Sequence, residues 1–128
     1  MKIAPVWWPA AWAGLIAMLM VIPVPAPPPV TGFNLGDKAV HFALFGMQAL
    51  LLLRYLHRRS GPEGSLPAAA GWAMLATTAF GAALEGLQAL LPFRSAEALD
   101  LAADAVGALL GATAYLGWHK FRGHKNIM

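Results

Sequence analysis

The chain contains no cysteine and few charged residues. The absence of cysteine among its 128 residues excludes disulfides and thiolate chemistry and leaves the redox compartment undetermined. Charged residues make up only 12% of the sequence, whereas an average soluble domain has about 25%. Hydrophobic residues make up 59%. This composition excludes an ordinary soluble domain and predicts an integral membrane protein.

Several enzyme motifs are also missing from the sequence. It has no serine nucleophile elbow, no phosphate-binding glycine loop and no zinc-binding helix motif. The net charge is +3, but the basic residues flank apolar blocks, where membrane topology and anionic headgroups account for them. We therefore expect a membrane partner and no nucleic-acid partner.

Apolar residues form four blocks that are each long enough to cross a bilayer, which requires about 20 residues per helix. We expect helices over about residues 6–24, 39–56, 66–91 and 95–118, the last capped by Ser95. A proline-rich connector, residues 23–29, follows the first block. The predicted fold is an all-α integral membrane four-helix bundle, in which residues 1–128 form a single domain.

The first block has two interpretations. Its length and position also suit a cleaved signal peptide, but its only preceding charge is Lys2, and prolines crowd the candidate cleavage stretch. Tryptophans at its start, Trp7, Trp8 and Trp12, suit the headgroup region of a bilayer. We therefore favour a retained membrane anchor.

The distribution of charge predicts an orientation. Seven basic residues and one acidic residue lie in the two termini and the connection between the second and third helices. Two basic and five acidic residues lie toward the other side. By the positive-inside rule, both termini are cytoplasmic, and we expect a multi-pass protein of the cell (inner) membrane.

Polar residues from three distant segments converge at the outer ends of the predicted helices. The second helix carries Asp37, Lys38 and His41 there, the third Glu85 and Gln88, and the fourth Asp100 and Asp104. Spacings of three or four residues place each set on one helix face. Carboxylates at membrane depth are unfavourable unless they face a partner or a wet cavity. These side chains should therefore face the bundle interior.

Small residues continue the same faces. Gly107 and Gly111 follow Asp104, and Thr78 and Gly81 precede Glu85. Small residues at this spacing allow membrane helices to approach closely. We expect Gly81, Gly107 and Gly111 to serve helix packing.

Three sequence segments resemble the pattern of VanZ-like membrane proteins. They are "DKAVHF", "EGLQALLPFRSAEALD" and "DAVGALLG", which are similar to Asp-Lys-x-x-His-Phe, Glu-x-x-Gln followed by Arg, and Asp-x-x-x-Asn-x-x-Gly. The resemblance extends from Asp37 to Gly111 and adds Arg94 to the polar positions. Asp104 departs from the pattern, since it replaces the asparagine and adds a negative charge. The family takes its name from a protein associated with teicoplanin resistance, so the resemblance implies a role in the cell envelope.

Three functional hypotheses follow for this polar site. In the first, an enzyme modifies a lipid-linked envelope intermediate, with His41, Glu85 and Asp100 as candidate catalytic residues and His41 or Glu85 as general base. Lys38 and Arg94 would hold a phosphate, with Asp37, Gln88 and Asp104 as further binding residues. In the second, the same pocket binds a headgroup or partner helix without catalysis. The third, a transporter, is disfavoured because no inverted repeat is evident.

Metal binding and a purely structural role also remain open. Four acids face two bases if His41 is neutral, so the site should hold a proton, a cationic His41 or a divalent cation. The spacing specifies no metal, and no other cofactor is expected. In the structural alternative, Asp37 caps its helix, Lys38 reaches the headgroups, and the other polar residues join helices. The sequence leaves the oligomeric state undetermined.

Overall fold

The described part of the chain consists of four helices. The computed structural model describes residues 6–21, 35–61, 64–91 and 98–127, in which no strand occurs. The helices are α1 (Trp7–Val21), α2 (Leu35–Ser60), α3 (Leu66–Leu90) and α4 (Ala98–Ile127). They confirm the predicted all-α, four-helix fold.

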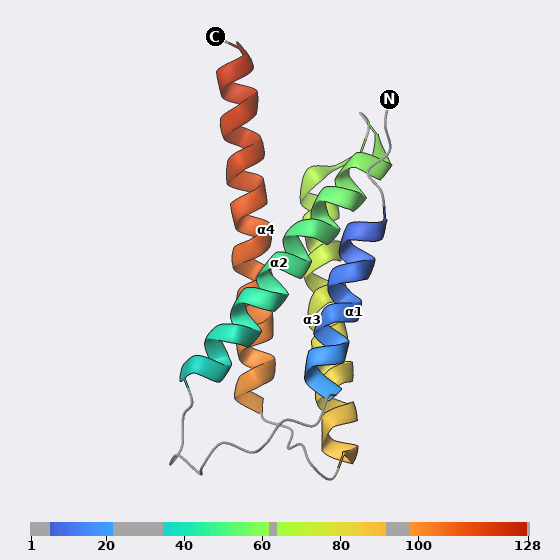
Figure 1. Ribbon diagram of the computed structural model, residues 1–128. Coiled ribbons are helices and arrows are strands. Elements are labelled where there is room, and N and C mark those ends of the chain that lie inside the picture. The colour runs from blue at the N-terminus through green and yellow to red at the C-terminus, as the bar shows by residue number, and fades with distance from the viewer. Residues whose placement is uncertain (1–5, 22–34, 62–63, 92–97, 128) are drawn as a thin grey trace.

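Successive helices run in opposite directions (Figure 1). The start of α1 and the end of α4 therefore lie at the same end of the bundle, together with the connection between α2 and α3. We call this the basic end, because Arg54, Arg58, Arg59, Lys120 and Arg122 lie toward it. We call the opposite end the acidic end, because Glu85, Asp100 and Asp104 lie toward it.

Two helices differ in length from the sequence-based expectation. Helix α2 begins at Leu35, before Asp37, and continues through the arginines to Ser60. Helix α4 continues to Ile127 instead of ending near Trp118. Neither helix contains a proline, so no residue removes a backbone donor within them. The expected cap Ser95 and the predicted helical residues 22–24 lie outside the described residues.

Three helices are long and apolar enough to cross a membrane. They correspond to Lys38–Ser60, Leu66–Leu90 and Ala98–Gly123. Helix α1 is also apolar, but its described part has 15 residues, fewer than the about 20 that a spanning helix requires. The structure therefore supports a multi-pass membrane protein, with three of the four expected crossings meeting the length criterion among the described residues.

Helix α3 has a polar interior face and an apolar outer face. Thr77, Glu85 and Gln88 are buried, whereas Trp72 and Leu90 are 66% and 81% exposed. A soluble helix shows the opposite pattern, with charged residues facing water. Polar groups that face other helices and large apolar groups that face outward are typical of a membrane bundle.

Helices α2 and α4 cross at three glycines. A Cβ atom added at Gly107 would lie 2.4 Å from the backbone oxygen of Phe42, and one at Gly111 would lie 2.0 Å from that of Gly46. At Gly46, an added Cβ would lie 3.1 Å from the backbone oxygen of Gly107. The two backbones are therefore in direct contact, as the small residues allow.

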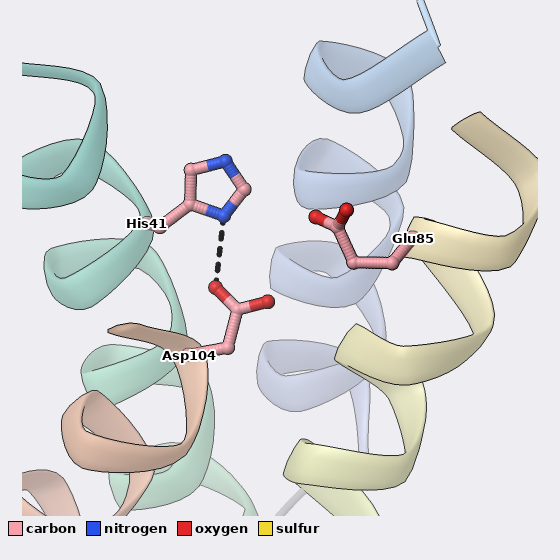
Figure 2. Close-up of side chains that lie close together, drawn as sticks. All are labelled: His41, Glu85 and Asp104. Carbon is pink, nitrogen blue, oxygen red and sulfur yellow. Dashed lines mark hydrogen bonds and ion pairs between the residues drawn. The ribbon is translucent and has the colours of Figure 1, made fainter. Parts of the chain in front are cut away.

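Helix α1 packs against α2 and α3 in the half of the bundle nearer the acidic end. Ile16 and Met20 form a buried cluster with Phe45 and Leu84. The indole Nε1 of Trp12 donates a hydrogen bond of 2.8 Å to the backbone oxygen of Leu44. Figure 2 shows α1 passing behind the side chains of His41, Glu85 and Asp104.

Candidate functional site

Six polar side chains are buried together toward the acidic end, and three helices supply two each. They are Lys38 and His41 of α2, Glu85 and Gln88 of α3, and Asp100 and Asp104 of α4, and their exposed fractions lie between 1% and 8%. Each pair is separated by three or four residues, so both members lie on one helix face. The structure thus places these predicted site residues in the bundle interior.

Lys38 and Asp100 form the outer part of this group. The Nζ atom of Lys38 donates a hydrogen bond to Oδ1 of Asp100, and both side chains are buried. The second carboxylate oxygen, Oδ2, lies 3.6 Å from Nε2 of His41. Asp100 therefore connects a lysine near the helix end with a histidine one turn deeper.

His41 lies between two aspartates of α4. Its Nδ1 atom is 2.8 Å from Oδ1 of Asp104, within hydrogen-bond distance, while Nε2 faces Asp100. Asp104 is the most deeply buried carboxylate of the group, with 1% of the residue exposed. A carboxylate at this depth requires an ionic or hydrogen-bonding partner, and the imidazole supplies one.

Glu85 approaches the His41–Asp104 pair from α3. Figure 2 shows its carboxylate directed toward the space between α3 and the other two helices. One ligand-type atom from each of His41, Glu85 and Asp104 lies within 4.8 Å of the other two. Three side chains that are distant in sequence therefore share one small volume.

A glycine faces this cluster. A Cβ atom added at Gly81 would lie 2.8 Å from Oδ2 of Asp104 and 3.1 Å from the ring of Phe45. Gly81 precedes Glu85 by one turn on the same face of α3. Any larger residue at position 81 would press against the carboxylate of Asp104.

Gln88 has a different environment from the other predicted binding residues. Its Nε2 atom donates a 3.0 Å hydrogen bond to the backbone oxygen of Met20 in α1. Its Oε1 atom is buried and has no hydrogen-bond partner among the described residues. The structure therefore places Gln88 at the junction of α1 and α3.

Two predicted residues cannot be placed at the site. Arg94 lies outside the described residues. The backbone of Asp37 belongs to the first turn of α2, but its side chain is not described. The interpretation of Asp37 as a cap preceding the helix is not supported, because the helix starts at Leu35.

Two buried polar residues were not among the predicted site residues. Gln48 and Thr77 are 6% and 1% exposed, and each has a buried side-chain oxygen with no hydrogen-bond partner among the described residues. Helical spacing could have identified them, because Gln48 follows His41 by two turns and Thr77 precedes Gly81 by one. Thr78, which was expected on the interior face, is partly buried.

The described charges at the site do not balance. Glu85, Asp100 and Asp104 carry three negative charges when ionised, and Lys38 carries one positive charge. With His41 neutral, two negative charges remain in an environment of low dielectric constant. Protonation of the cluster or a bound cation would remove this excess. The arrangement can therefore hold protons, a cation or a ligand that donates hydrogen bonds.

Comparisons with known proteins identify one family. The family model described as VanZ/LLP1 matches residues 6–119, which include all four helices up to the last turns of α4. No curated protein and no solved structure matches the chain.

Proposed function

Because the chain belongs to the VanZ/LLP1 family, we propose that this membrane protein binds the polar headgroup of an envelope lipid or lipid-linked intermediate. The binding site is the group of buried polar residues at the acidic end. The proposed location is the cell (inner) membrane, with the acidic end in the outer leaflet.

The observation that carries this proposal is the burial of Lys38, His41 and three carboxylates inside a membrane bundle. Replacement of a buried ion pair by well-packed apolar residues is often neutral or stabilising. A bundle selected for stability alone therefore gains little from five ionisable groups here. Ionisable residues within membrane segments most often mark a ligand, ion or proton site.

The charge distribution supports the proposed orientation. The arginines of α2 and the two lysines and one arginine of α4 lie toward the basic end, which the positive-inside rule assigns to the cytoplasm. The acidic end then faces the outer leaflet, where headgroups of lipid-linked wall precursors are accessible. Binding of such a precursor would link the protein to glycopeptide (teicoplanin) resistance.

Binding accounts for the geometry better than catalysis does. Both ring nitrogens of His41 face carboxylates, at 2.8 Å and 3.6 Å, and Lys38 is paired with Asp100. These groups hold each other in fixed positions, which suits recognition of a polar ligand. A general base requires a nitrogen that is free to accept a proton.

One observation favours the catalytic alternative. The 3.6 Å separation between Nε2 of His41 and Asp100 is too long for a hydrogen bond. The 2.8 Å contact of Nδ1 with Asp104 is the arrangement of a catalytic histidine oriented by a carboxylate. Conversion of the bound lipid to a product would distinguish this alternative from binding alone.

The test is mass spectrometry of lipids that remain bound to the gently purified full chain. We expect the wild type to retain one headgroup class, and Glu85→Gln and His41→Ala to lose it while remaining folded and inserted. Thr113→Ala is the control, because Thr113 is an exposed α4 residue whose hydroxyl donates to the backbone oxygen of Leu109 in the same helix. Teicoplanin susceptibility of cells expressing each variant provides a second readout.

The two substitutions also separate function from scaffolding. Glu85→Gln keeps the size and hydrogen-bonding capacity of the side chain but removes its charge. Folded variants that retain the same lipid as the wild type would contradict the proposal. Loss of the folded protein in both variants would instead assign these residues a structural role.

A further inference from the structure

The cluster of His41, Glu85 and Asp104 has the composition of a metal site. The three residues come from three different helices, are 4%, 8% and 1% exposed, and place one ligand-type atom each within 4.8 Å of the others. From this geometry we infer that they bind a divalent metal ion that accepts mixed nitrogen and oxygen ligands, of the zinc or manganese class.

The donor set determines the class of ion. One imidazole nitrogen and two carboxylates suit zinc, which takes histidine and carboxylate ligands at about 2.0–2.2 Å. Manganese accepts carboxylate and water ligands and also tolerates imidazole. The chain has no cysteine, so no thiolate ligand is available. Three protein ligands leave at least one coordination position for a water molecule or for a ligand oxygen.

Residues around the cluster match the outer shell of a metal site. A metal-bound histidine usually directs its second ring nitrogen at a carboxylate, which fixes the ring orientation. In this structure Nδ1 of His41 faces Asp104, and Nε2 faces Oδ2 of Asp100 at 3.6 Å. Asp100 is itself paired with Lys38. If Nδ1 binds the ion, Asp100 is the carboxylate nearest to Nε2, at 3.6 Å and beyond hydrogen-bond distance.

The charge of the site also fits a divalent ion. The described acids exceed the described bases by two when His41 is neutral, the protonation state that metal binding requires. A divalent cation brings this sum to zero without any protonated carboxyl group. Carboxylates at membrane depth are favourable only with a partner, and a divalent cation would be one.

His41 and Asp104 are spaced almost like two ligands of one ion. Tetrahedral ligands at zinc distances lie about 3.3 Å from one another, whereas Nδ1 of His41 and Oδ1 of Asp104 are 2.8 Å apart. A shift of about half an ångström would therefore admit the metal between them. Gly81 has no side chain to obstruct Oδ2 of Asp104. Figure 2 shows Glu85 facing the same volume from the other side.

The metal would deepen the proposed headgroup function. Lys38 is engaged by Asp100, so the ion would supply positive charge for a headgroup phosphate. In this respect the inference rests on the proposed function. Metal binding itself is measured without any lipid, so the two proposals can fail separately.

The experiment measures metal content of the full chain in detergent. The protein is stripped with a chelator, loaded with zinc chloride or manganese chloride alone, desalted and analysed by inductively coupled plasma mass spectrometry. We expect about one ion per chain for one of the two metals, and at least a tenfold lower content in Glu85→Gln and Asp104→Asn. Circular dichroism checks that both variants remain helical.

Two controls locate the ion. Thr77→Val changes another buried polar residue of α3 and should leave the metal content unchanged. The double variant His57→Ala, His119→Ala removes the other two histidines with described side chains, whose rings lie 4.8 Å apart toward the basic end. It should also retain the metal.

The alternative results overturn the inference. Wild-type protein that takes up neither metal would refute it, even if headgroup binding persists. Equal metal content in wild type and folded Glu85→Gln would also refute it, as would loss of metal only in the His57, His119 variant. Metal binding without lipid retention would instead refute the headgroup proposal alone.

Discussion

The Nδ1 atom of His41 lies 2.8 Å from Oδ1 of Asp104, although 63 residues separate them in the sequence. The contact depends on the crossing of α2 and α4, at which Gly107 lies against the backbone of Phe42. Phe42 directly follows His41, and Gly107 lies three residues after Asp104. An aspartate side chain is short, so only helices in near contact allow it to reach the imidazole. The small residues therefore position the polar ones.

This dependence predicts that a large side chain at the crossing destabilises the bundle. Gly111→Leu would force a side chain against the backbone oxygen of Gly46, which an added Cβ would approach to 2.0 Å. Overpacking of this kind costs about 1–3 kcal/mol or more. We expect a lower melting temperature in detergent, measured by circular dichroism. Gly117→Leu is the control on the same helix, because an added Cβ there meets nothing within 4 Å. Equal melting temperatures for the two variants would contradict the packing role.

Sequence reasoning identified the helices because their signals are local. Apolar blocks and helical spacing predict that each helix exists and that Glu85 and Asp104 face inward, since a carboxylate facing lipid is unfavourable. The ends were less predictable, because α4 continues through polar residues to Ile127 without a helix-breaking proline. The change from apolar to polar residues marks the membrane boundary. The helical backbone can continue beyond that boundary into water.

The pairing of site residues could not be derived from sequence. Spacing places Lys38 and His41 on one face, but it does not show that Lys38 contacts Asp100 while His41 contacts Asp104. These contacts depend on the register between two helices. Gln48 and Thr77 were missed because they carry no charge, although their helical spacing from His41 and Gly81 matches the interior face.

Membrane orientation gives a second prediction. The chain has no cysteine, so a single cysteine introduced at Thr31 or at Ser60 reports one site without background. An impermeant thiol reagent applied to intact cells should label Thr31→Cys and leave Ser60→Cys unlabelled, because the positive-inside rule places the basic end in the cytoplasm. Permeabilised cells serve as the control, in which both should react. The reverse labelling would place the polar site at the cytoplasmic face.

A third prediction concerns the attachment of α1. Trp12→Phe keeps an aromatic ring but removes the hydrogen bond from Nε1 to the backbone oxygen of Leu44. We expect a loss of about 0.5–1.5 kcal/mol in the free energy of unfolding, detected as a lower denaturation midpoint in mixed detergent. Trp8→Phe is the matched control, because Trp8 is 64% exposed. Similar midpoints for Trp12→Phe and the wild type would show that apolar packing alone holds α1.

The last prediction separates the contribution of the Lys38–Asp100 pair to bundle stability from its role in ligand binding. Lys38→Met leaves Asp100 buried without its lysine, and removal of one partner of a buried pair costs about 3–5 kcal/mol. The double variant Lys38→Met, Asp100→Leu replaces both charges by apolar groups of similar size, so it should recover most of that loss. Thermal unfolding in detergent measures both effects. If the pair serves ligand binding, the double variant should be stable yet retain no specific lipid. A stable double variant that keeps the wild-type lipid would show that the pair is only a structural contact. A double variant as unstable as Lys38→Met would show that Asp100 stabilises the bundle through His41 as well.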